Sequence, residues 1–254
     1  VSDAAKELDA EIDVWRNRPL GRYQYLMLDA RYEHVRQANA VVSSAVLVAV
    51  GMTYDGQREL LGVSVSLSEA EVHWRQFLQS LMERGMHGLT MVISDAHTGL
   101  RKALETCFPG TPWQRCQFHL QQNAMSHVPK VSMRTEVAAD IRSVLNAPDR
   151  QEADRLLNIR IDKYRSSAPD LATWLEENVP QSLTVFQVPA AHRRMLRTTN
   201  MVERLNREIK KRTKIASIFP NPESALRLVA AMLMETSEQW LNGKRYLPAE
   251  QTQS

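Results

Sequence analysis

Three strand-forming segments near the start of the chain constrain its fold more than any other feature. They cover residues 23–30, 41–50 and 59–66, and Tyr54-Asp55-Gly56 separates the last two. An Asp-Gly pair between two apolar segments is typical of a tight β-hairpin turn. We therefore expect the three segments to pair as an antiparallel meander. The first segment ends at Asp29, so we expect an acidic side chain to close a buried strand.

A helix and a fourth strand are expected after the meander. Ser68 and Glu71 have the spacing of a capping box, which predicts the start of the helix. The apolar segment 90–93 is then predicted to be a strand, and Asp95 follows it. A strand–helix–strand connection usually joins parallel neighbouring strands. Asp95 is therefore expected beside Asp29 on one edge of the sheet.

The remainder of the chain is expected to be mostly helical. Thr98 is the predicted cap of the next helix, and a fifth strand is expected at 112–116. From 120 to 192 apolar residues recur at helical spacing, which predicts an all-α insertion. Asn221-Pro222 is expected to cap a long final helix. The predicted fold class is thus α/β, a mixed five-stranded sheet with flanking helices that an all-α insertion interrupts.

The composition is that of a soluble globular protein, with 43% hydrophobic and 24% charged residues. The two cysteines, Cys107 and Cys116, are too few for a disulfide framework and fit a reducing cytoplasm. The longest apolar segment, Val41–Val50, contains two serines and is shorter than the roughly 20 residues of a membrane helix. We therefore expect a cytoplasmic protein without a membrane partner.

The most basic segment lies between Arg193 and Lys214, where nine residues are Lys or Arg and two are acidic. Such an imbalance is typical of a nucleic-acid surface. One of the acids, Glu203, lies three residues after Asn200, which is the spacing of a capping box. From this segment alone, a capping role and a chemical role for Glu203 are equally compatible with the sequence.

Asp29, Asp95 and Glu203 together form a candidate metal site. If the insertion is looped out, they lie on the first strand, the fourth strand and the closing helix of one sheet. Three hard oxygen ligands suit magnesium, with manganese as a substitute. Two such ions about 4 Å apart can activate an attacking hydroxyl and stabilise the leaving oxygen in phosphoryl displacement. The expected DNA contacts are Arg197, Arg204, Arg207, Lys210 and Lys211.

Five local motifs are spread along the chain. They are LDA at 28–30, AVGMTYDGQRELLGVSVSLSEAEVHWRQFLQSLMERG at 49–85, SDAHTGL at 94–100, WQRCQFH at 113–119 and TTNMVERLNREIKKRT at 198–213. Together they resemble the bacterial insertion-sequence transposases of the Mutator type, over nearly the whole chain. The resemblance implies an RNase H-like core and a DDE transposase whose metal-binding triad is Asp29, Asp95 and Glu203.

The resemblance also implies a reaction and partners. Water cleaves a transposon end to leave a 3′-hydroxyl, which then attacks another phosphodiester without a covalent protein intermediate. The implied partners are double-stranded DNA, as transposon ends and target, and a second copy of the chain on paired ends. Relatives carry an N-terminal helix-turn-helix region, which we expect to be missing because this chain begins with Val. Residues 120–123 are uncharged, whereas such families usually have basic residues there.

We expect four parts along the chain. Residues 1–20 are predicted to be a linker helix and 21–119 the first part of the RNase H-like core. Residues 120–192 are the predicted insertion, and 193–254 the closing helices of the core. In the cell such a protein is expected to be associated with the nucleoid.

Several other residues have a structural interpretation beside a functional one. Cys116 and His119 have the spacing of half a zinc site, but no second pair follows, so a packing or positioning role is preferred. His97 either contacts a phosphate or hydrogen-bonds within its turn. Trp174 has the spacing of a buried core residue, although related transposases can stack an aromatic on an extruded base. Asp140 is expected at a turn, a cap or a solvent-facing position.

Two other functions are compatible with the same residues. A metal-dependent nuclease would use the three carboxylates for cleavage without joining. A truncated DNA-binding protein would act as a repressor or competitor without catalysis. The intact carboxylates at 29, 95 and 203 favour an enzyme.

Overall fold

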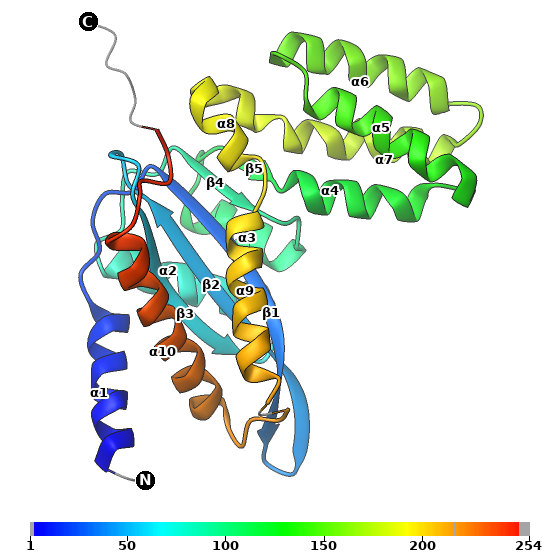
Figure 1. Cartoon of the computed structure of the whole chain (residues 1–254). Helices are drawn as coiled ribbons and strands as arrows, with labels where there is room; N and C mark the ends of the chain where they lie inside the picture. The colour runs from blue at the N-terminus through cyan, green and yellow to red at the C-terminus, as the bar shows by residue number, and fades with distance from the viewer. Residues whose placement is uncertain (1–2, 216, 249–254) are drawn as a thin grey trace, which may run out of the picture. The chain divides into compact units, whose positions relative to one another are not determined.

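The computed structural model describes residues 3–215 and 217–248 (Figure 1). The chain divides into two compact units. The first comprises Val1–Val92, Ala96–Thr111 and Asn200–Ser254, and the second comprises Ile93–Asp95 and Pro112–Thr199. The two units are described separately below. In the part of the chain that the structure describes, no helix is both long and apolar enough to cross a membrane.

One mixed sheet carries all five strands, in the order β3-β2-β1-β4-β5. The strands are β1 (Tyr25–Gln37), β2 (Ala40–Met52), β3 (Arg58–Ser66), β4 (Met91–Ser94) and β5 (Trp113–Arg115). The first three pair antiparallel, so the predicted meander is confirmed. Gly56 has a φ of 86° in the β2–β3 turn, a left-handed conformation that favours glycine. The predicted mixed five-stranded sheet with flanking helices, interrupted by an all-α segment between β5 and α9, is thereby confirmed.

Strand β1 is longer than the sequence predicted, so the expectation that Asp29 closes it was wrong. The strand has 13 residues, and its pairing with β2 runs from Tyr25–Met52 to Gln37–Ala40. Beyond Leu28, positions 29–31 are half-buried, and from Tyr32 to Gln37 exposed residues alternate with half-buried or buried ones. Only the first part is continuously apolar, and the amphipathic part is held by pairing with β2, which a search for apolar segments misses.

Helices cover both faces of the sheet in the first unit. Figure 1 shows α9 (Asn200–Thr213) and α10 (Pro222–Leu241) in front of the sheet and α2 (Glu71–Glu83) and α3 (Thr98–Cys107) behind it. Each helix buries an apolar stripe, as expected for amphipathic helices on a sheet. Helix α1 (Asp3–Asn17) is tied to α10 by an ion pair in which Arg227 Nη2 donates to Asp9 at 2.7 Å.

The residues at which the helices begin show that two predictions were wrong and that a third was right. Ala70, not Ser68, is the residue before α2, and no side chain caps that helix, so the predicted capping box is wrong. Thr98 is the first residue of α3 rather than its cap. The Asn221 side chain accepts a hydrogen bond from Ser224 N at 2.8 Å, which confirms the predicted cap of α10. Propensity places a helix start within a few residues, whereas tertiary contacts decide its cap.

The second unit is helical around its own apolar core. After β5 come α4 (Gln117–Ala124), η1 (Met125–His127), η2 (Val131–Met133), α5 (Arg134–Leu145), α6 (Arg150–Tyr164), α7 (Pro169–Asn178), η3 (Val179–Ser182), η4 (Thr184–Gln187) and α8 (Ala190–Leu196). Its core includes Leu120, Val137, Leu157 and Leu171. The prediction for Asp140 was wrong, because it lies within α5 and accepts hydrogen bonds from Lys163 and Tyr164, each at 2.6 Å.

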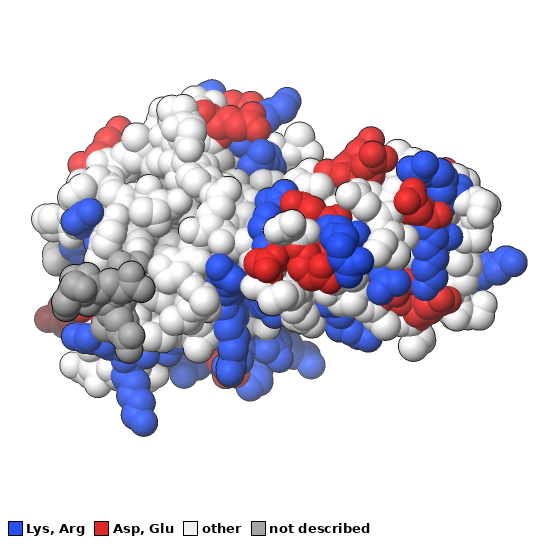
Figure 2. Space-filling model, turned by 90° about the horizontal axis from the view of Figure 1, so that it is seen from above, with Lys and Arg blue, Asp and Glu red and all other residues white. Residues whose placement is uncertain are grey.

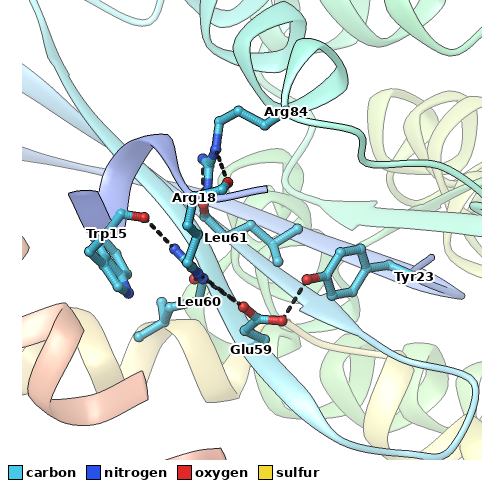
Figure 3. Close-up of polar contacts among 7 residues, drawn as sticks. All are labelled: Trp15, Arg18, Tyr23, Glu59, Leu60, Leu61 and Arg84. Carbon is cyan, nitrogen blue, oxygen red and sulfur yellow. Dashed lines mark hydrogen bonds and ion pairs between the residues drawn. The ribbon is translucent and has the colours of Figure 1, made fainter. Parts of the chain in front are cut away.

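Two arginines cover the backbone of edge strand β3 in the first unit (Figure 3). Gly62 pairs with Ala49 and Leu60 with Val50, so Leu61 is the extra residue of a β-bulge. Arg84 Nη1 donates to Leu61 O at 2.8 Å, and Arg18 Nη2 donates to Leu60 O at 2.6 Å. Unpaired carbonyl groups inside a protein are costly, and these guanidinium groups satisfy two of them.

Glu59 holds Arg18 in this position. Its carboxylate accepts a hydrogen bond from Arg18 Nη2 at 2.7 Å and another from Tyr23 Oη at 2.5 Å. Burial raises the pKa of the Tyr23 phenol, and the hydrogen bond to Glu59 adds to the rise. Burial also lowers the pKa of Arg84 to about 10, with a contribution from nearby Arg18. The Tyr23 phenol and the Arg84 guanidinium therefore keep their donor protons at neutral pH.

We predict that Glu59→Gln lowers the free energy of unfolding by about 1.5–3 kcal/mol, because the hydrogen bonds that Arg18 and Tyr23 donate to a charged acceptor are weakened. The matched control is Glu71→Gln. Both acids pair with an arginine, but the Glu59 side chain is 19% exposed and the Glu71 side chain 37%. The control should cost about 0–1 kcal/mol, as for exposed pairs. Urea unfolding followed by circular dichroism measures both, and equal losses would contradict the assignment.

Candidate active site

Asp29 and helix α9 are joined directly within the first unit. Asn206 Nδ2 donates a hydrogen bond to Asp29 Oδ2 at 2.7 Å. Both residues are half-buried, and α9 packs against β1. A carboxylate that accepts a hydrogen bond from a fixed amide keeps one rotamer. The amide therefore fixes the direction in which Asp29 presents its second oxygen.

The same face of β1 continues the contact with α9. Arg31 Nη1 donates to the backbone carbonyl of Asn206 at 2.8 Å, and Arg31 Nη2 lies 2.5 Å from Glu33 Oε1. Thr213 Oγ1 donates to Glu33 at 2.9 Å. Burial lowers the pKa of Arg31, while Glu33 opposes the shift. We call these five residues, Asp29, Arg31, Glu33, Asn206 and Thr213, the polar seam.

Glu203 lies in the first turn of α9, three residues before Asn206. The apolar side chains of Val202, Leu205 and Ile209 are all buried on this helix. Glu203 is half-buried, and residues three apart on a helix are neighbours on its surface. Asp29, Asn206 and Glu203 therefore all belong to the contact region of β1 and α9. Asn200 is the first helical residue.

The basic residues of the predicted DNA surface fall into two groups. Arg204, Arg207 and Lys210 are exposed on α9. Lys211 is exposed too, but it pairs with Glu208 at 2.7 Å. Arg197, in the second unit, donates to Asn146 Oδ1 at 2.8 Å and to the last carbonyl of α5 at 3.1 Å, and burial lowers its pKa. Figure 2 shows basic and acidic side chains interspersed on the face seen from above.

Asp95 directly follows β4 and is described with the second unit. Its backbone carbonyl accepts a hydrogen bond from Ser94 Oγ at 2.8 Å, and Ser94 Oγ accepts one from Trp113 Nε1 at 2.9 Å. Burial lowers the pKa of Arg115, and the charge of Asp95 opposes that shift. A buried cation in the same unit therefore interacts favourably with the Asp95 carboxylate.

Cys116 and His119 lie at the start of α4 in the second unit. The Cys116 thiol is fully buried, and its sulfur accepts hydrogen bonds from Thr199 Oγ1 at 3.3 Å and Thr199 N at 3.4 Å. Burial alone raises the pKa of this thiol, but hydrogen bonds from His119 and Thr199 outweigh it and lower the pKa overall. The thiol thus connects α4 with the segment before α9.

His97 and Gly99 lie where α3 meets the segment before α2. His97 Nδ1 is 4.0 Å from Glu69 Oε2, so the histidine contacts a carboxylate of its own unit. A Cβ atom on Gly99 would lie 2.2 Å from Glu69 O, so only glycine fits there. This close approach of two backbones holds the beginning of α3, which follows Asp95 by three residues.

Trp174 is half-buried rather than fully buried as preferred from the sequence. It packs against the core of the second unit, and its ring stacks on His127 with centroids 5.2 Å apart. The Arg115 guanidinium lies 5.6 Å from the ring centroid. The histidine and arginine contacts engage the indole ring within its own unit.

A comparison with known families decides the membership of the chain. The family described as "Transposase, Mutator family" matches residues 1–243. The chain belongs to the Mutator family of transposases. It is 53% identical over 247 residues to the transposase for insertion sequence element IS406 of Burkholderia multivorans, covering 97% of this chain and 64% of that protein. The resemblance inferred from the motifs is thereby confirmed.

Other transposases of insertion sequences are similar. The one for ISRM5 of Rhizobium meliloti is 41% identical, covering 97% of this chain and 62% of that protein. The one for IS256 in transposon Tn4001 of Staphylococcus aureus is 36% identical, covering 96% and 63%. The chain thus spans somewhat less than two thirds of these curated relatives. Among solved structures, a Drosophila P element transposase strand transfer complex has 11% identity and a TM-score of 0.46, covering 94% of this chain and 82% of that chain.

Asn206, Arg31 and Arg115 were not predicted from the sequence of this Mutator-family chain. Asn206 follows Glu203 by three residues, so helical spacing alone would have placed the two side chains on neighbouring positions. Arg31 lies two residues after Asp29, so both side chains are on one face of β1, but this signal is visible only if the strand continues beyond Asp29. For Arg115 the sequence carries no comparable signal, because its burial depends on the insertion.

We predict that Gly99→Ala lowers the free energy of unfolding by about 1–3 kcal/mol, because the added methyl group collides with the Glu69 backbone. Gly21→Ala is the matched control, since a Cβ atom there meets nothing within 4 Å. The control should change stability by less than about 0.5 kcal/mol. Chemical denaturation measures both values, and a neutral Gly99→Ala would show that the close approach is not required.

Proposed function

We propose that this chain is the catalytic core of a DDE transposase that cleaves transposon ends and joins them to DNA. Membership of the Mutator family carries the proposal. Three carboxylates, Asp29, Asp95 and Glu203, are its catalytic and metal-binding residues. In support, Asp29 and Glu203 lie on packed elements of one unit, and Asp95 follows β4, the neighbour of β1 in the strand order.

The donor set fits magnesium, with manganese as a substitute. All three proposed ligands are carboxylates, which are hard oxygen donors suited to octahedral ions rather than to zinc. Asp29 Oδ2 accepts a hydrogen bond from Asn206, which orients this carboxylate as a ligand group. When bound, the divalent ion supplies an activated nucleophilic oxygen and stabilises the oxygen that leaves.

The residues of the chain have separate tasks in this proposal. Asn206 and Arg31 hold Asp29 and α9 in register, so that Glu203 is presented from a fixed helix. Arg204, Arg207 and Lys210 bind phosphate groups of the DNA, because they are exposed and lie on the same helix as Glu203. Lys211 and Arg197 contribute less, since Glu208 and the end of α5 already engage them.

The wider assembly follows from the same proposal. Double-stranded DNA, as transposon ends and as target, is the proposed partner, bound by two copies of the chain on paired ends. Residues 1–20 serve as a linker, 21–119 and 193–254 as the catalytic core, and 120–192 as its insertion. Because its proposed partner is DNA, we propose that the protein acts on the nucleoid in the cytoplasm.

We predict that Asp95→Asn lowers magnesium-dependent cleavage of a transposon end by at least about 1,000-fold, because an ion held by fewer carboxylates stabilises the transition state less. DNA affinity should change less than about twofold, since the phosphate contacts are elsewhere. The assay uses the chain extended to the length of its relatives. Unchanged cleavage would refute the triad.

A strand-transfer assay with pre-cleaved ends and magnesium tests the joining step. Joined products are expected from the unsubstituted protein and not from Asp95→Asn. Cleavage without joining would identify a nuclease instead. DNA binding without either reaction would identify a regulatory derivative.

We predict that the double substitution Arg207→Ala and Lys210→Ala weakens DNA binding about equally for all sequences. It should reduce the slope of log affinity against log salt by about 2, because two phosphate contacts are lost. Lys102→Ala is the control, since Lys102 is exposed on α3, which packs on α2 behind the sheet. Fluorescence anisotropy at several salt concentrations measures the slopes. An unchanged slope would exclude α9 as the DNA surface.

A further inference from the structure

Asn206 carries a polar atom that the protein does not satisfy. Its Nδ2 donates to Asp29, but its Oδ1 is buried and accepts no hydrogen bond from the described residues. An unsatisfied buried carbonyl costs about 1–3 kcal/mol, and few persist in native proteins. The acceptor capacity of this oxygen is therefore not used by any described residue.

The orientation of the amide is fixed by its neighbour. Exchanging the amide nitrogen and oxygen would place Oδ1 against Asp29 Oδ2, and a carboxylate offers no proton to it. The amide therefore presents its nitrogen to Asp29 and its oxygen elsewhere. A carbonyl oxygen with a free lone pair is a ligand atom for hard divalent cations and an acceptor for the water molecules that such ions retain.

The position of Asn206 is as constrained as its orientation. Its backbone carbonyl accepts from Arg31, and Arg31 is held by Glu33. The side chains of Arg31 and Glu33 are only 10% and 12% exposed, so this anchor is shielded from water. Preorganised donors of this kind bind an ion without the cost of ordering flexible side chains.

Two acidic residues, Asp29 and Glu203, accompany Asn206 Oδ1 as possible ligands of the same ion. Asp29 is hydrogen-bonded to Asn206, and Glu203 precedes it by three residues on the same helix. Asp29, Glu203 and Asn206 thus supply two carboxylates and one amide carbonyl from a single contact region within the first unit. Mixed carboxylate and amide oxygen sets are typical of sites for divalent ions with octahedral coordination.

We propose that Asn206 is part of the divalent-ion site: Nδ2 fixes the Asp29 carboxylate, and Oδ1 is an oxygen donor to the ion or to a water molecule on it. This inference rests on the proposed function, because it assigns Asp29 and Glu203 to the same ion. It adds a residue that binds through oxygen and does not itself need to ionise. Asn206 is accordingly a positioning residue for Asp29 and a donor to the ion.

The test measures binding of Mn²⁺ to the chain, by isothermal titration calorimetry, without DNA. Asn206→Ala should weaken Mn²⁺ binding by about 10–100-fold, the usual effect of losing a supporting group at a metal site. Asn206→Asp restores an oxygen donor and should bind Mn²⁺ at least as tightly as the unsubstituted chain. Gln239→Ala, which removes an exposed amide from α10, should leave the affinity unchanged.

Thermal unfolding with and without Mn²⁺ separates ion binding from a structural role. In EDTA, Asn206→Asp should unfold at a lower temperature than the unsubstituted chain, because a second carboxylate then faces Asp29. Saturating Mn²⁺ should remove that difference, since binding stabilises the folded state. A variant that loses stability equally in EDTA and in Mn²⁺, with unchanged affinity, would overturn the inference.

Asp29→Asn distinguishes the proposed role of Asn206 from the proposed carboxylate site for the ion. If Asp29→Asn abolishes Mn²⁺ binding while Asn206→Ala leaves it unchanged, the role of Asn206 is refuted and the carboxylate site stands. If Asp29→Asn leaves Mn²⁺ binding unchanged, the carboxylate assignment itself is wrong. If the unsubstituted chain binds no Mn²⁺, both are overturned.

Discussion

The polar seam between β1 and α9 is the constraint on which the proposed chemistry depends. Asp29 contacts Asn206, and Glu33 contacts Thr213. Four residues of strand span about 13 Å and seven residues of helix about 10 Å. The helix therefore runs alongside the strand in the same direction, and two contacts at separate points fix its rotation. Burial of the apolar stripe alone would permit small rotations of α9, and each would move Glu203 relative to Asp29.

The sequence predicted the parts of the fold that local patterns determine. An Asp-Gly turn between apolar segments was enough for the β2–β3 hairpin, and Asn221-Pro222 was enough for the start of α10. The second half of β1 was missed because its polar residues are held in the sheet by β2, a partner known only after folding. The Asn206–Asp29 bond was missed for the same reason, since residues 177 positions apart share no local signal.

The count of Lys and Arg identified the basic segment. It could not show which of these side chains bind the protein's own carbonyl groups and which are exposed. Arg193 and Arg197 donate to backbone carbonyls and to Asn146, and so hold loops of the second unit. Arg204, Arg207 and Lys210 are exposed. A guanidinium group serves either purpose equally well, because its planar donors fit carbonyl oxygens as readily as phosphate oxygens. Only the position of the neighbouring backbone decides between them.

The arginines at strand β3 have a consequence for how copies of this protein meet. An open sheet edge is a template on which another chain can add a strand, and long open edges lead to aggregation. At the bulge, Arg18 and Arg84 occupy two carbonyls of β3 and place positive charge along that border. A second copy approaching edge to edge would meet charge and already occupied acceptors. The bulge and its two arginines thus disfavour the addition of a strand at this edge.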